Sequence, residues 1–158
     1  MPKPFIDLRS DTVTKPSTEM LEAMFKAEVG DDVFHEDPTV IALQEKIAKL
    51  FSMEASLFFP SGTMANQVAI KIQTNPGDQV ICDKDAHIFH YESGGVAFNS
   101  GVSCCLINGN NGQFTSEDVK NNINKPEFYH TPFSKLVAIE NTANRAGGTF
   151  WNFTELKA

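Results

Sequence analysis

Residues 57–67 read LFFPSGTMANQ, and the rest of the chain can be understood outward from them. The apolar run 57–59 predicts a short buried strand, and the Ser-Gly-Thr that follows predicts a tight turn into a helix. The first amides of a helix lack intrahelical acceptors and carry partial positive charge, so they bind anions, phosphate above all. Ser61, Gly62 and Thr63 are therefore candidate phosphate-binding residues. The alternative is that Ser61 only caps the helix, which is the commoner role of a serine before a helix.

The composition is that of one globular domain with an acidic surface. The chain has 158 residues, 41% of them hydrophobic, and a formal net charge of −7. That length is enough for a single core. The negative charge disfavours nucleic acid and anionic membranes as partners. Because we find neither an apolar run of about 20 residues nor the apolar core of a signal peptide, we expect a cytoplasmic protein that acts on small molecules.

The three cysteines do not form a disulfide framework. Their number is odd, and Cys104 and Cys105 are adjacent in a strand-like run. We interpret them and Cys82 as buried thiols that act as small apolar side chains. The cysteines and histidines do not have the spacing of a recognised metal site, so we expect no metal.

Several helices have clear start signals. Ser17 precedes an apolar face of methionine, leucine and phenylalanine, and Gly30 is a candidate end for that helix. Asp37 followed by Pro38 predicts the start of a second helix with apolar residues at spacings of three and four. Thr115, three residues before an aspartate, resembles a capping box.

Apolar runs alternate with these helices along the chain. The runs 79–82, 102–107 and 136–140 are continuously apolar rather than alternating, which is typical of parallel strands covered on both faces. The predicted fold class is therefore α/β, with a mostly parallel sheet sandwiched by helices. In such sheets ligands bind beyond the carboxyl ends of strands. His87 and the Glu-Asn-Thr of residues 140–142 lie at those ends and are candidate site residues.

Five ordered motifs resemble one enzyme family. They are IDLRSDTVT at 6–14, VGDDV at 29–33, EDPTV at 36–40, FPSGTMANQ at 59–67 and DAHI at 85–88. All five are similar to motifs of the low-specificity L-threonine aldolases, which are pyridoxal-phosphate enzymes grouped with the β-eliminating lyases. The resemblance runs collinearly from about residue 5 to the end. It implies the aspartate-aminotransferase type of fold, with this chain as the N-terminal part of the large domain.

The resemblance also implies roles for particular residues. Ser61, Gly62 and Thr63 match the family's phosphate-binding turn, in agreement with the helix argument. His87 matches the histidine that stacks on the cofactor ring and is a candidate base for the substrate hydroxyl. Ser10 matches a residue that contacts the substrate carboxylate. The implied cofactor is pyridoxal 5′-phosphate.

The implied activity is cleavage of L-threonine or L-allo-threonine to glycine and an aldehyde. Two alternatives stay open: another β-eliminating lyase or an aldolase for bulkier β-hydroxy amino acids, and a non-catalytic truncated domain. The family resemblance also implies a homo-oligomer, either a dimer or a tetramer, whose active sites are shared between subunits.

The sequence departs from the family pattern at two positions. Ala143 stands where many members have a histidine that contacts the substrate hydroxyl, and an alanine can neither donate nor accept a hydrogen bond. His35 stands where glycine is common in the family. These differences leave the preferred substrate and its stereochemistry open.

The chain also ends inside a helical pattern, so we expect it to be part of a longer protein. We expect residues 1–15 to contribute to the active site and residues 16–158 to form part of the cofactor-binding domain. None of the lysines Lys120, Lys125, Lys135 and Lys157 lies in the family's cofactor-lysine motif. We therefore expect the chain alone to be inactive, and its exposed apolar surface to promote association.

Overall fold

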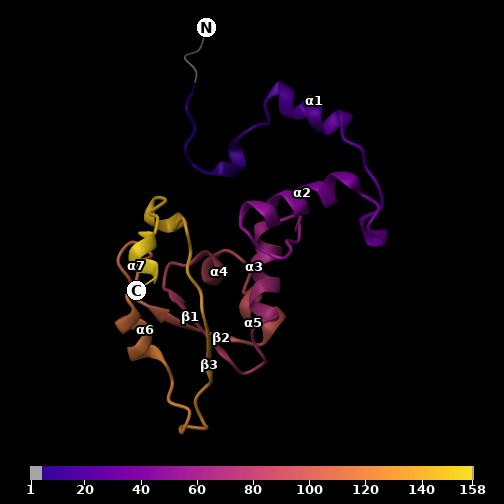
Figure 1. Cartoon of the computed structure of the whole chain (residues 1–158). Helices are drawn as coiled ribbons and strands as arrows, with labels where there is room; N and C mark the ends of the chain where they lie inside the picture. Colours follow the sequence, from indigo (N-terminus) through magenta and orange to yellow (C-terminus); the bar gives the residue numbers. More distant parts are fainter. Residues whose placement is uncertain (1–4, 158) are drawn as a thin grey trace. The chain divides into compact units, whose positions relative to one another are not determined.

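The computed structural model describes residues 5–157 of the chain (Figure 1). Its contacts divide the chain into two compact units, one up to Phe58 and one from Phe59 onward. We describe each unit by itself. The boundary expected at residue 15 separates a segment that would contribute to the active site from the cofactor-binding domain, and it stays a prediction.

The first unit consists of helices that begin at clear capping residues. Its elements are the short 3-10 helices η1 (Asp11–Val13) and η2 (Asp32–Phe34) and the α-helices α1 (Thr18–Lys26) and α2 (Pro38–Leu50). The Ser17 hydroxyl accepts a hydrogen bond from the Met20 amide at 3.3 Å, and the Asp37 carboxylate accepts one from the Val40 amide at 2.9 Å. Both predicted helix starts are thus confirmed. The first helix ends at Lys26, before the predicted Gly30.

The second unit is built on a three-stranded parallel sheet. The strands are β1 (Gln79–Asp83), β2 (Ser103–Ile107) and β3 (Ser134–Val137), in the spatial order β2-β1-β3. The central strand β1 pairs with both neighbours in parallel. Its three central side chains, at residues 80–82, are at most 1% exposed. The predicted parallel α/β arrangement is confirmed.

Helices lie before, between and after the strands of this unit (Figure 1), and both faces of β1 are packed against apolar residues. The helices are α3 (Gly62–Lys71), α4 (His87–His90), α5 (Gly95–Ser100), α6 (Ser116–Asn122), the 3-10 helix η3 (Asn144–Ala146) and α7 (Phe153–Lys157). On one face Ile70 of α3 and Val96 of α5 pack with Val80 of β1. On the other face Ile81 packs with Phe114 and with Val119 of α6. Each face of β1 therefore has its own apolar cluster.

The cysteines behave as apolar side chains and are free thiols. Cys82 is fully buried, whereas Cys104 and Cys105 are partly buried. The contact with Cys104, together with burial, raises the pKa of the Cys82 thiol. This thiol therefore stays protonated and fills space in the core.

One predicted strand is wrong. Residues 57–59 form no strand, and the side chains of Leu57 and Phe58 are 69% and 48% exposed. A strand needs hydrogen-bonding neighbours, but the Phe58 amide instead donates to the Gln44 side-chain oxygen at 2.8 Å. The apolar run predicted both burial and a strand, but Leu57 and Phe58 are exposed and no described strand pairs with them.

Other boundaries also differ from the sequence prediction. The third strand ends at Val137 rather than Glu140. Beyond its end, the Glu140 side chain accepts a hydrogen bond from the His87 amide, which lies in the segment after β1. Helix α5 was missed altogether. It is only six residues long, and the glycines at both its ends, Gly94 and Gly101, adopt left-handed conformations. None of the helices in the described part of the chain combines the length and apolar character that a membrane span requires.

Candidate functional site

The site begins at the carboxyl end of β1, where a buried carboxylate organises two loops. Asp83 is 4% exposed. One of its oxygens accepts a hydrogen bond from the Asp85 amide at 2.8 Å, and the other accepts one from the Gly109 amide at 3.0 Å. A buried carboxylate needs such donors. Asp83 therefore fixes the segment that leads from β1 to His87 against the loop that follows β2.

The backbone of His87 is held by the loop after β3. The His87 amide donates to Glu140 Oε2 at 2.8 Å, and Glu140 Oε1 accepts from the Asn144 amide at 2.9 Å. Glu140 belongs to the strand-end segment that the sequence marked together with His87. The structure thus brings these two candidate regions into direct contact.

The ring of His87 is anchored by a second carboxylate. His87 Nδ1 lies 2.9 Å from Glu92 Oε1, and the Glu92 side chain is fully buried. About a third of the histidine side chain (36%) remains exposed. Tyr91 lies beside the ring, with its centroid 5.4 Å away. One nitrogen of the imidazole therefore contacts a buried carboxylate, while about a third of the side chain remains exposed.

Helix α3 contacts the same carboxylate. Asn66 Nδ2 donates to Glu92 Oε1 at 2.7 Å, and Gln67 Nε2 donates to Glu92 Oε2 at 2.5 Å. Gly95 leaves room for this arrangement, because a Cβ atom there would lie 2.6 Å from the Gln67 side chain. Glu92 consequently links His87 to the helix that begins at the predicted phosphate-binding turn.

The N-terminus of α3 has free amides. The Ser61 hydroxyl accepts a hydrogen bond from the Met64 amide at 3.1 Å, so its capping role is confirmed. Within residues 5–157, no acceptor hydrogen-bonds the amides of Gly62 or Thr63. A Cβ atom on Gly62 would have no atom within 4 Å, so the space beside this turn is open. These two amides are therefore candidate anion donors within the second unit.

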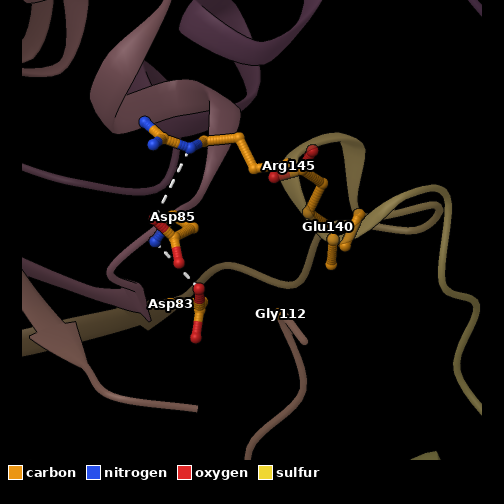
Figure 2. A pocket seen from close by; sticks show the side chains of 7 residues that line it. Asp83, Asp85, Gly112, Glu140 and Arg145 are labelled. Carbon is orange, nitrogen blue, oxygen red and sulfur yellow. Dashed lines mark hydrogen bonds and ion pairs between the residues drawn. The ribbon is translucent and has the colours of Figure 1, made fainter. Parts of the chain in front are cut away.

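A small hollow lies next to Glu140 (Figure 2). Its lining comprises Asp83, Asp85, Gly112, Glu140, Ala143, Arg145 and Ala146. Arg145 Nε lies 3.5 Å from Asp85 Oδ1. Lys84, and more weakly Arg145, hold the pKa of the Asp85 carboxyl below its usual range. Ala143, the position that departs from the family pattern, is buried at 4% exposure in the wall of this hollow.

Two other sequence-marked residues lie in the first unit. The Ser10 hydroxyl accepts a hydrogen bond from the Thr12 amide at 3.2 Å and caps η1. A role of Ser10 toward a substrate stays a prediction. His35 follows η2 with φ of 58°, a left-handed conformation that favours glycine.

Sequence reasoning missed Glu92, Asn66 and Gln67. A usable signal was present in Gln67, which stands at a buried position of an otherwise apolar helix face and is 7% exposed. A buried amide side chain requires hydrogen-bond partners. The sequence does not identify that partner, because Glu92 lies 25 residues from Gln67.

Comparison with known proteins places these features in context. Residues 7–158 match the beta-eliminating lyase family. The chain is 44% identical over 140 residues to the low specificity L-threonine aldolase of Escherichia coli K12, covering 88% of this chain and 42% of that protein. It is 41% identical over 148 residues to low-specificity L-threonine aldolase 1 of Arabidopsis thaliana, covering 90% of this chain and 41% of that protein.

A solved structure has the same fold. The threonine aldolase of Leishmania major superimposes with a TM-score of 0.69 at 23% sequence identity, covering 87% of this chain and 39% of that one. The chain therefore spans about two fifths of the length of the relatives it matches. The predicted fold type is confirmed for this portion.

Proposed function

This chain belongs to the beta-eliminating lyase family, and on that premise we propose that it is part of a pyridoxal-phosphate-dependent aldolase. The reaction is the cleavage of L-threonine or L-allo-threonine to glycine and an aldehyde. The single observation that supports it best is the link between His87 and helix α3 through Glu92. One carboxylate holds both a candidate base and the helix of a candidate phosphate site.

The residues present fit the cofactor. The free amides of Gly62 and Thr63 and the open space beside Gly62 suit a phosphate group. The accessible ring of His87 suits contact with a heterocycle. When bound, pyridoxal phosphate supplies an electron sink for the electrons released from the broken Cα–Cβ bond. Ser61, Gly62 and Thr63 would hold its phosphate.

His87 is the residue that we propose as the base. An imidazole takes up a proton near neutral pH, and cleavage requires removal of the proton on the substrate β-hydroxyl. The Glu140 contact holds the backbone of His87, and the Glu92 contact holds its ring. Ser10 would contact the substrate carboxylate, as the family resemblance implies.

The experiment is an assay of the full-length gene product for glycine release from L-threonine and L-allo-threonine. We expect cleavage of both, and we expect His87→Ala to reduce kcat by about 10²–10⁴-fold, the usual contribution of general acid–base catalysis. His130→Ala is the matched control, because His130 is exposed and lies outside the site. If neither substrate released glycine in the presence of the cofactor, the proposal would be contradicted.

A second candidate function is an aldolase for bulkier β-hydroxy amino acids. Ala143 favours it, because this small residue lines the hollow where the family commonly has a histidine. Phenylserine in the same assay separates the two candidates. A higher kcat/KM for phenylserine than for threonine would favour the bulkier substrate, and Ala143→His should then shift the ratio toward threonine.

The 158-residue chain alone is proposed to lack aldolase activity. None of Lys120, Lys125, Lys135 and Lys157 lies in the motif that carries the cofactor lysine in the family. Borohydride reduction in the presence of pyridoxal phosphate, followed by mass spectrometry, tests this. A single stoichiometric pyridoxyl-lysine on this chain would contradict it.

Subunit assembly is a further part of the proposal. The family resemblance implies a homo-oligomer with shared sites, and sedimentation of the full-length gene product measures its mass directly. A monomer that retains full activity would contradict shared sites.

A further inference from the structure

Glu92 is a buried acid that lies outside all five sequence motifs. It lies between α4 and α5, and its side chain is fully buried. An ionised carboxylate in such a place is destabilising unless hydrogen-bond donors surround it. Two side chains, Asn66 and Gln67, supply donors, and His87 Nδ1 lies 2.9 Å from Glu92 Oε1.

The donors identify which groups carry protons. Gln67 Oε1 accepts a hydrogen bond from Asn99 Nδ2 at 3.3 Å, so the amide nitrogen of Gln67 is the end that faces Glu92. Asn66 donates to the other oxygen of the same carboxylate. With both oxygens accepting from amide nitrogens, the Glu92 carboxylate presents an acceptor to His87 Nδ1.

We propose that Glu92 is a positioning residue that fixes both the ring orientation and the tautomer of His87. Because Glu92 can only accept, His87 Nδ1 carries the proton at the 2.9 Å contact. In a neutral imidazole this leaves the lone pair on Nε2, the nitrogen that can then take a proton from a substrate. The inference rests on the proposed function, in which His87 is the base.

The same carboxylate also sets where the ring lies. Asn66 and Gln67 are the fifth and sixth residues of α3, so they lie close to its N-terminus. Glu92 therefore holds the ring at a fixed place relative to the candidate phosphate site, while Glu140 holds the backbone of His87 independently. The two acids act on different parts of one residue, which makes them a matched pair for experiment.

The first test is nitrogen-15 NMR of the full-length gene product, labelled at histidine and measured without added cofactor. His87 is assigned by comparison with His87→Gln. At about pH 8.5, above the usual range of histidine titration, we expect the proton on Nδ1 and an unprotonated Nε2. A proton on Nε2 would overturn the proposal, and this result needs no variant at the acid.

The second test compares Glu92→Gln with Glu140→Gln. A glutamine at 92 can donate as well as accept, so the Nδ1–H tautomer should lose its dominance, with kcat lower by on the order of 10–100-fold and KM changed less. Glu140→Gln alters only the backbone contact, so the Nδ1–H tautomer should persist. Retention of that tautomer with unchanged kcat in Glu92→Gln would overturn the proposal.

Failure of this inference can be told apart from failure of the proposed function. Cleavage of threonine by an enzyme whose His87 carries its proton on Nε2 would overturn the role of Glu92 alone. The Nδ1–H tautomer in a protein that cleaves neither threonine nor allo-threonine would uphold the positioning by Glu92 and overturn the aldolase assignment.

Discussion

The two units of this chain differ in how much of each is buried. In the first unit, helices α1 and α2 begin at capping side chains, and among residues 5–58 only Ala48 is buried. In the second unit, β1 is buried on both faces by residues far away in the sequence. Local hydrogen bonds thus suffice to place helix ends, whereas a core requires contacts between distant segments.

The largest expected effect on the free energy of unfolding comes from shortening an isoleucine, and we compare one isoleucine from each unit. Ile81 is 1% exposed in the core of the second unit, and Ile6 is 78% exposed in the first. We expect Ile81→Ala to lower the free energy of unfolding by about 2–5 kcal/mol, because it leaves a cavity. Ile6→Ala should change it by no more than about 0.5 kcal/mol. Urea denaturation measures both, and equal losses would break the comparison.

An intermediate effect is expected where a glycine touches backbone. A Cβ atom at Gly109 would lie 2.4 Å from the Gln113 carbonyl oxygen and 2.5 Å from Asp83 Oδ2. Gly109→Ala should therefore destabilise the second unit by about 1–3 kcal/mol. Gly62→Ala is the control, since nothing lies within 4 Å of its Cβ position. Thermal unfolding followed by circular dichroism distinguishes them, and a neutral Gly109→Ala would contradict the packing described here.

The smallest effect is expected at the capping aspartates, one in each unit. Hydrogen bonds from the Val40 and Gly30 amides lower the pKa of Asp37, and those from the Thr115 hydroxyl and amide lower the pKa of Asp118. A lowered pKa in the folded state gives stability that is present above the ordinary carboxyl range and is lost as the pH falls through the lowered pKa.

Asp37→Asn and Asp118→Asn should each reduce this acid sensitivity while leaving a competent cap at neutral pH. The measurement is the free energy of unfolding at intervals between about pH 6 and pH 2. Because both caps are local, the two variants should behave alike despite the different packing of their units. A clear difference between them would show that the caps depend on tertiary contacts.

The sequence predicted those features that depend on neighbours in the chain. The caps at Ser17, Asp37 and Ser61 were confirmed, as was the capping box at Thr115. Continuous apolar runs also predicted the parallel strands. The strand predicted at residues 57–59 does not form. A strand exists only where another strand pairs with it, and composition does not reveal the partner.

The candidate site divides in the same way. The motifs marked Ser61, Gly62, Thr63 and His87 because residue type and order along the chain are visible in the sequence. The structure alone placed Glu92 against His87 and Glu140 against the His87 backbone, through contacts that span 5 and 53 residues.

The sequence by itself determined the starts of the helices with capping side chains, the three parallel strands and the family to which the chain belongs. Only the tertiary structure decided which acids hold His87, because hydrogen bonds between side chains depend on the distance and direction that folding creates. Residue types fix what each group can donate or accept, and the fold selects which of those groups meet.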